Sequence, residues 1–207
     1  MLDLKLKFKK ENTALIIVDM QNDFVREGAP MEVSDARGTI APISELINMA
    51  RKNKMPVIFT KFVAGPKRTL LWNWSSAIPE NCSCFRNYKR SYKDIAGERE
   101  CADVIDELYP LAEDYVIEKY GYSAFRNTNL IDILRANDCD GIIVTGTVTQ
   151  ICVGDTVHDA FHEGLKVIVA SDCVSSFSEL QQKATIENFK QKYGDVTDSK
   201  RIIEMFS

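Results

Sequence analysis

The chain has 207 residues, 45% of them hydrophobic, and a formal net charge of -4 at pH 7. This is enough for one sizeable core, so we expect residues 1–207 to form a single domain. Acidic and basic residues are interspersed without a basic patch, which argues against nucleic acid as a partner. The start of the chain lacks the apolar stretch of a signal peptide, and no later stretch could span a bilayer. We therefore expect a cytoplasmic protein that does not bind membranes.

The cysteines and histidines do not form a metal motif. Six cysteines are scattered through the chain, which suits a reducing compartment. Cys82 and Cys84 have one residue between them, whereas zinc and redox motifs have two. His158 and His162 are one helical turn apart, and we interpret them as bystanders because they fall in the body of a predicted helix. The sequence thus predicts no metal ion and no organic cofactor.

Short apolar runs alternate with segments of helical periodicity along most of the chain, which is typical of an α/β fold with a parallel sheet. The first strand is expected at residues 14–18 and the second at residues 55–60, with a helix around residues 40–50 between them. Further strands are expected at residues 115–119, 141–144, 165–170 and 195–197, and helices follow several of them. The pattern predicts a mainly parallel sheet of about six strands.

Residues 63–97 break this alternation. They contain Trp72 and Trp74, followed by a basic group of Lys89, Arg90 and Lys93. A long irregular segment in a compact protein is more often a lid or an oligomer contact than an empty loop. The basic group either attracts an anionic substrate or is an ordinary solvated surface.

Three residues at the ends of predicted strands are candidates for catalysis. Asp19 and Lys119 each end an apolar run, and ligands of open parallel sheets bind beyond the carboxyl ends of the strands. Cys152 follows a strand and a glycine-containing turn, near the start of a predicted helix whose N-H groups favour a thiolate. Each residue also has a structural alternative: a capping carboxylate, a surface lysine and a buried core cysteine.

The segments that carry these residues, at positions 14–24, 116–125 and 144–153, together resemble the isochorismatase-like cysteine hydrolases. The resemblance covers nearly the whole chain. It implies a three-layer α/β/α Rossmann-like fold, and it implies a homo-oligomer, either a dimer or a tetramer.

The resemblance also implies a role for each candidate. Asp19 takes the position of the general base, Lys119 that of the lysine beside it, and Cys152 that of the nucleophile. A cis peptide bond is implied at Thr147–Val148, with the backbone N-H groups of Val148 and Cys152 forming an oxyanion hole. Substrate contacts are expected from residues near these positions, although aromatic side chains there are as often plain core: Phe24, Trp72, Trp74, Tyr122 and Thr149.

Departures from the family's subgroups narrow the expected activity. Nicotinamidases carry an Asp-x-His metal motif where this chain has residues 60–62, Thr-Lys-Phe, and true isochorismatases lack the nucleophilic cysteine. Thr147 and Gln150 also differ from the family's commoner residues. The resemblance therefore predicts a cysteine-dependent amidohydrolase that cleaves a C-N bond of a small carboxamide, carbamoyl or ureide compound through a thioester. The alternatives are nicotinamidase or isochorismatase activity, a catalytically silent binding protein, and a redox sensor.

Overall fold

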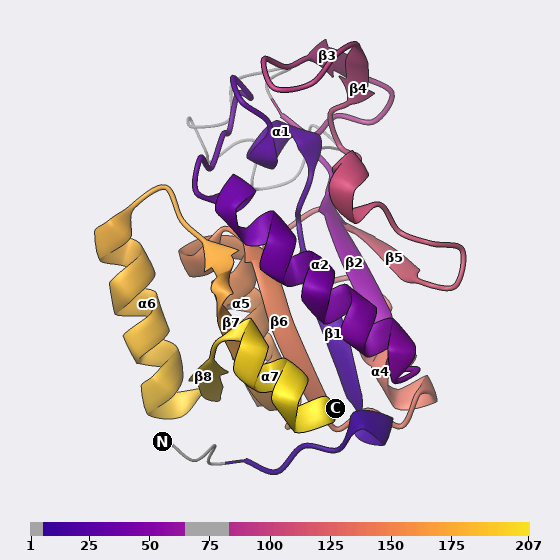
Figure 1. The fold of residues 1–207 in the computed structure, drawn as a ribbon, viewed down its shortest axis with the longest axis vertical. Helices are drawn as coiled ribbons and strands as arrows, with labels where there is room; N and C mark the ends of the chain where they lie inside the picture. Colours follow the sequence, from indigo (N-terminus) through magenta and orange to yellow (C-terminus); the bar gives the residue numbers. More distant parts are fainter. Residues whose placement is uncertain (1–5, 65–82) are drawn as a thin grey trace.

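A computed structural model describes residues 6–64 and 83–207 of the chain. Its centre is a six-stranded sheet with the strand order β5-β2-β1-β6-β7-β8 (Figure 1). All neighbouring strands in this sheet are parallel, which confirms the predicted sheet. Its strands are β1 (Thr13–Val18), β2 (Val57–Phe62), β5 (Tyr115–Lys119), β6 (Gly141–Thr147), β7 (Lys166–Ser175) and β8 (Asp195–Thr197).

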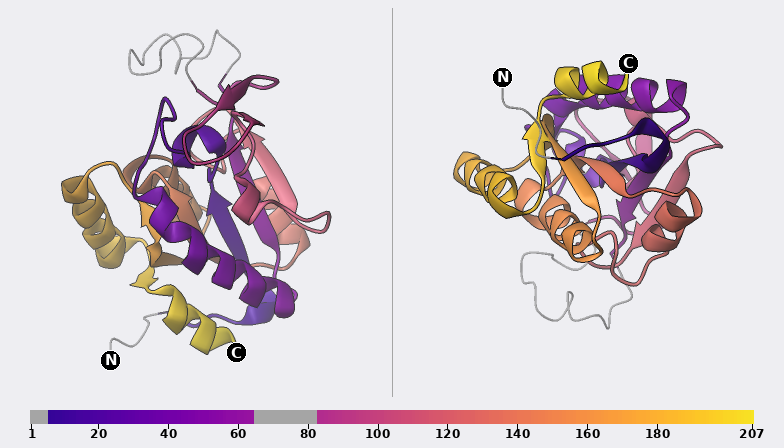
Figure 2. Two further views of the ribbon diagram at one scale, coloured as in Figure 1. Left: turned by 45° about the horizontal axis from the view of Figure 1, so that its top comes forward. Right: turned by 90° about the horizontal axis from the view of Figure 1, so that it is seen from below.

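Helices cover both faces of the sheet, as the views from two directions show (Figure 2). One face is covered by α2 (Ala36–Lys52) and α7 (Ser199–Phe206). The other is covered by α4 (Leu130–Ala136), α5 (Gly154–His162) and α6 (Glu179–Lys192). A short helix, α1 (Asn22–Val25), follows β1 at the carboxyl end of the sheet. This is the predicted three-layer α/β/α arrangement.

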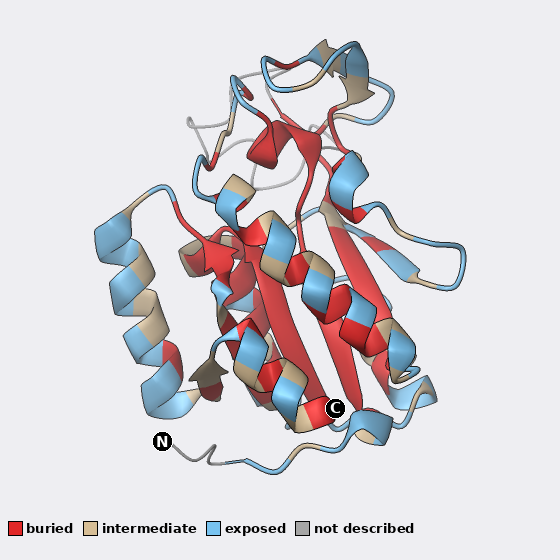
Figure 3. Ribbon diagram, in the orientation of Figure 1, coloured by how far each residue is buried: buried red, intermediate tan, exposed pale blue. Residues whose placement is uncertain are grey.

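The apolar patterns of the sequence account for this layering. Every residue of β1 is buried, as expected for a strand covered on both faces (Figure 3). In α2, Ile43, Leu46, Ile47 and Ala50 recur at helical spacing and form a buried stripe toward the sheet. Burial of each large aliphatic side chain contributes about 1.5–3 kcal/mol before entropy is counted. Packing against the sheet therefore stabilises α2 much more than its own helix propensity does.

The structure extends and corrects the predicted elements in two places. Strand β7 continues to Ser175, beyond the expected end at residue 170, because its pairing with β6 resumes after a register shift between Val144 and Gly146. An antiparallel hairpin, which we did not predict, begins in the irregular segment with β3 (Lys89–Ser91) and ends just after it with β4 (Glu98–Glu100). Strands of three residues with charged side chains have too little apolar periodicity to be recognised in a sequence.

Gly146 allows the two central strands to approach each other closely at their carboxyl ends. It lies opposite Val18 in the β1–β6 register and has a φ of 104°. A Cβ atom at this position would lie 2.0 Å from the Val18 carbonyl oxygen, well inside van der Waals contact. The glycine thus places the turn after β6 directly beside the residue that follows β1.

Replacement of this glycine gives the first test. We expect Gly146→Ala to lower the free energy of unfolding by at least about 3 kcal/mol, because it combines a backbone clash with a positive φ. Chemical denaturation monitored by circular dichroism measures the change. Gly38→Ala is the control: Gly38 lies in α2 with no atom within 4 Å of an added Cβ. This variant should gain up to about 1 kcal/mol. Equal effects of the two substitutions would contradict the close approach of β1 and β6.

Candidate active site

Asp19 and Lys119 form a buried ion pair at the carboxyl end of the sheet. The Lys119 Nζ lies 2.6 Å from the Asp19 Oδ2, and both side chains are 0% exposed. Asp19 is the first residue after β1, and its φ of 50° turns the chain away from the strand. Lys119 is the last residue of β5, which is separated from β1 by β2. The lysine therefore reaches across the end of β2 to meet the carboxylate.

Thr60, on the intervening strand β2, forms a hydrogen bond with the second oxygen of the Asp19 carboxylate. Its Oγ1 donates a hydrogen bond of 2.6 Å to the Asp19 Oδ1, while the Asp19 N-H donates to the Thr60 carbonyl oxygen at 3.2 Å. Each carboxylate oxygen thus has a donor of its own. Sequence reasoning missed Thr60, although a hydroxyl residue within the apolar run of β2 was a visible signal.

Cys152 lies beside this ion pair in η3 (Thr149–Val153), a π-helical turn between β6 and α5. Its side chain is 4% exposed and interacts with both Asp19 and Lys119. Burial raises the pKa of the Cys152 thiol well above its ordinary value, Lys119 opposes this rise, and the Asp19 carboxylate adds to it. The surroundings of Cys152 therefore favour the neutral thiol, and the Asp19 side chain lies beside it.

The charge of Lys119 is secured by the same contacts. Burial lowers the pKa of Lys119, but its interactions with Asp19 and then with Cys152 outweigh burial, so its pKa is raised above the usual value. The ammonium group also donates a hydrogen bond of 3.2 Å to the Gly121 carbonyl oxygen. Lys119 consequently remains a fixed cation rather than a proton donor near neutral pH.

The turn that carries Cys152 begins with a cis peptide bond at Thr147–Val148, as expected. The Val148 carbonyl oxygen accepts hydrogen bonds from the N-H groups of Ile151 and Val153, at 3.0 and 3.2 Å. These bonds fix the backbone of the turn. Val148 and Cys152, whose N-H groups are expected to form the oxyanion hole, thus belong to one short, rigid segment.

The aromatic residues that we expected to contact the substrate differ in their burial and in their neighbours. Phe24 is buried in α1 and packs against Phe62, with ring centroids 6.3 Å apart, and the Lys119 Nζ lies 5.6 Å from the Phe62 ring. Tyr122 is partly buried, and burial and then the nearby Cys152 raise its pKa. Phe24 therefore packs against the ring that lies beside the ammonium group, whereas Tyr122 lies near the thiol. Trp72 and Trp74 lie outside the described residues.

Thr149 lies in the turn of the nucleophile, whereas two arginines from residues 63–97 are paired with carboxylates. Thr149 is fully buried in the turn before Cys152. Arg86 is paired with Glu118, and the Arg90 Nε is 3.1 Å from an oxygen of the buried Asp23, so carboxylates already compensate both cations.

The metal-motif candidates give no metal site in the described residues. His158 stacks on Tyr193 at 4.3 Å between ring centroids, in the body of α5. Cys82 lies outside the described residues, and Cys84 is buried. Residues 6–64 and 83–207 contain no group of three His, Cys, Asp or Glu side chains that could hold a metal ion.

An α/β fold that brings a cysteine, a carboxylate and an ammonium group together beyond its strand ends is the architecture of a cysteine hydrolase. Comparison with known proteins gives the family: residues 13–201 match the isochorismatase domain. The chain belongs to the isochorismatase family. The prediction made from the three sequence segments is thereby confirmed.

Individual relatives agree with this assignment. The ureidoacrylate amidohydrolase RutB of Yersinia enterocolitica is 33% identical over 207 residues, which cover 93% of this chain and 88% of the relative. A solved cysteine hydrolase from Pseudomonas syringae pv. phaseolicola has a TM-score of 0.83 and 27% identity over 100% of this chain and 98% of its own. N-carbamoylsarcosine amidase from Thermoplasma acidophilum has a TM-score of 0.75 and 29% identity, covering 91% and 96%. The relatives thus include hydrolases of C-N bonds in small linear amides.

Three further predictions stay predictions: the single domain, the homo-oligomer and the cytoplasmic location. The helices within residues 6–64 and 83–207 lack the length and apolar character needed to cross a membrane.

The ion pair itself can be tested through stability. We expect Lys119→Met to lower the free energy of unfolding by about 3–5 kcal/mol, because it leaves the Asp19 carboxylate buried without a counter-charge. The double variant Asp19→Asn, Lys119→Met should recover much of this loss, which denaturant titration can measure. Lys61→Met is the control, since its partner Asp103 has a 38% exposed side chain. It should change stability by about 1 kcal/mol or less. A loss in the double variant equal to the sum of the losses from Asp19→Asn alone and Lys119→Met alone would contradict a coupled pair.

Proposed function

We propose that the chain is a cysteine-dependent amidohydrolase in which Cys152, Asp19 and Lys119 cleave a C-N bond of a small carboxamide, carbamoyl or ureide compound. The observation that carries the proposal is the placement of Cys152 beside a buried Asp19–Lys119 pair, close enough for both charged groups to affect the pKa of the thiol. A thiol, a proton acceptor and a fixed cation are the groups required for nucleophilic attack on an amide carbonyl. The names of the relatives support the same class of reaction.

The first half of the reaction forms a thioester. Asp19 accepts the proton of Cys152, and the thiolate attacks the carbonyl carbon of the substrate. Negative charge develops on the carbonyl oxygen, where the backbone N-H groups of Val148 and Cys152 donate hydrogen bonds. Asp19 then gives its proton to the nitrogen as the C-N bond breaks, so ammonia or an amine leaves. Lys119 keeps the site charge-balanced while the proton moves.

The second half regenerates the thiol. Asp19 takes a proton from water, the resulting hydroxide attacks the thioester carbonyl, and the C-S bond breaks. The proton returns to sulfur, and the acid or carbamate product leaves. One carboxylate thus serves as base and then acid in each half of the reaction. The Thr60 hydrogen bond to Asp19 supports this role because it holds the carboxylate in one orientation.

Ammonia release across a set of neutral and carboxylated amides, ureides and nicotinamide tests the proposal. Cys152→Ala should abolish turnover, and Asp19→Asn should reduce kcat by about 100-fold or more, because the nucleophile or its base is lost. Cys139→Ala is the matched control: this buried cysteine lies before β6, at the opposite end of the strand from the site. It should retain activity.

Three results would contradict the proposal. Near-normal ammonia release by Cys152→Ala would exclude the covalent mechanism. Activity on isochorismate alone, or a clear preference for nicotinamide that is lost with chelation and restored by zinc, would point to the other subgroups of the family. Preferential iodoacetamide labelling of a cysteine other than Cys152 in an inactive protein would favour the redox sensor.

A further inference from the structure

Four buried side-chain oxygen atoms that have no hydrogen-bond partner in the protein gather at one junction of the fold. The described residues have only one other buried side-chain atom of this kind, a nitrogen of Arg90. Since the great majority of buried polar atoms are hydrogen-bonded, a concentration of this kind calls for an explanation. The four atoms are Thr149 Oγ1, Gln150 Oε1, Ser175 Oγ and Gln182 Oε1.

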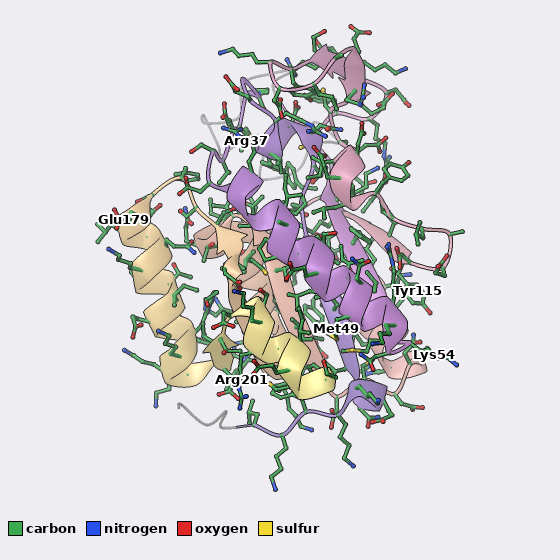
Figure 4. All side chains as sticks on the ribbon, viewed as in Figure 1. Arg37, Met49, Lys54, Tyr115, Glu179 and Arg201 are labelled. Atoms are coloured by element: carbon green, nitrogen blue, oxygen red, sulfur yellow. The ribbon has the colours of Figure 1, made fainter. Side chains whose placement is uncertain are left out.

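Hydrogen bonds hold the junction together. It joins η3, the end of β7 and the first turns of α6, where Glu179 marks the start of the helix in Figure 4. The Gln182 Nε2 donates to the Val174 carbonyl oxygen at 3.1 Å. The Gln150 Nε2 donates to the Gln181 Oε1 at 2.9 Å. Because the Gln182 amide nitrogen is engaged by a carbonyl, its oxygen is oriented as a free acceptor.

The junction adjoins the nucleophile. Thr149 precedes Cys152 by three residues in the same π-helical turn. Ser175 pairs in register with Thr147, and the Thr147 Oγ1 donates to the Ser175 carbonyl oxygen at 3.2 Å. The Thr149 and Ser175 side chains are 0% and 3% exposed. Two fully enclosed hydroxyl groups thus flank the turn that carries Cys152.

We propose that Thr149, Ser175 and Gln182 are specificity-determining residues that bind N-H groups in the part of the substrate beyond the scissile carbonyl. This inference rests on the proposed function. An amide oxygen can only accept a hydrogen bond, and hydroxyl groups can accept as well as donate. A substrate amide nitrogen would satisfy these atoms, whereas a carboxylate would face the negative end of the Gln182 amide dipole.

The nearby charges favour the same class of substrate. Arg90, from the basic group considered as an attractor of an anionic substrate, is paired with Asp23, and Arg86 is paired with Glu118. The four oxygen atoms of the junction belong to uncharged side chains. We therefore infer a substrate with a second, neutral amide or carbamoyl group rather than a carboxylate at this position.

Malonamide and its half-acid malonamate differ only in this group, so they form a matched pair of probes. The wild-type enzyme should have the higher kcat/KM on malonamide. Thr149→Val and Ser175→Ala should each raise the KM for malonamide by about tenfold with little change in kcat, because they remove a binding contact remote from the reacting bond. Their KM for malonamate should change less than twofold. Ammonia release measures all of these values.

Ser176→Ala is the control for Ser175→Ala. Ser176 is equally buried, at 3% exposed, but its Oγ already accepts a hydrogen bond of 3.0 Å from the Ser178 N-H. Its replacement should leave both KM values unchanged. A similar rise of KM in Ser176→Ala would show that the effect arises from disturbance of the loop and would overturn the inference.

Thermal unfolding of the ligand-free protein gives a second readout. A buried hydroxyl without a partner destabilises the fold, so Thr149→Val, which keeps the side-chain shape, should raise Tm by about 2–4 °C. Ser176→Ala should lower Tm because it removes a satisfied group. A lower Tm for Thr149→Val would mean that its hydroxyl is already satisfied by structural water, which would overturn the assignment of Thr149.

These outcomes separate the inference from the function on which it rests. If the wild-type protein releases ammonia from no amide, the proposed function itself fails. If it hydrolyses amides through Cys152 but prefers malonamate, or if Thr149→Val and Ser175→Ala affect both probes equally, only the specificity assignment is wrong.

Discussion

The buried Asp19–Lys119 ion pair is the interaction on which the rest of the site depends. Removing two charges from water is so unfavourable that the pair persists only with close contact and complete hydrogen bonding. The structure supplies both: a contact of 2.6 Å, the Thr60 hydroxyl on the second carboxylate oxygen and the Gly121 carbonyl on the ammonium group. Cys152 is therefore placed against an electrostatic arrangement that is fixed before any substrate arrives, and little reorganisation is needed during proton transfer.

The sequence predicted those parts of the molecule that local patterns encode. The apolar runs gave the six strands of the sheet, and polar residues at their carboxyl ends drew attention to Asp19 and Lys119. Two other features depend on contacts between distant segments. Thr60 contacts Asp19 because β1 and β2 are neighbours, and β7 continues to Ser175 because β6 continues to pair with it. The β3–β4 hairpin is local, but its sequence has almost no apolar pattern from which it could be predicted.

The site combines two kinds of surroundings. On the β5 side, the Phe62 ring lies beside the ammonium group, and Phe24 packs against Phe62. On the β7 side, the protein leaves oxygen atoms without internal partners. Low polarity strengthens the charges that take part in the chemistry, while free acceptors favour recognition of a polar ligand. A single cavity cannot be both apolar and rich in free acceptors. The fold therefore places the apolar surroundings on the β5 side of the central strands and the free acceptors on the β7 side.

The position of β5 has a consequence for the heat sensitivity of the enzyme. Within residues 6–64 and 83–207, this strand lies at the edge of the sheet and pairs with β2 alone, yet its last residue is Lys119. Edge elements open locally at a lower free energy than the central strands, without unfolding of the whole domain. Detachment of β5 would carry the ammonium group away from Asp19 while β1, β6 and the thiol stayed in place. Catalysis is therefore expected to fade on warming before the core melts, and to return on cooling without refolding.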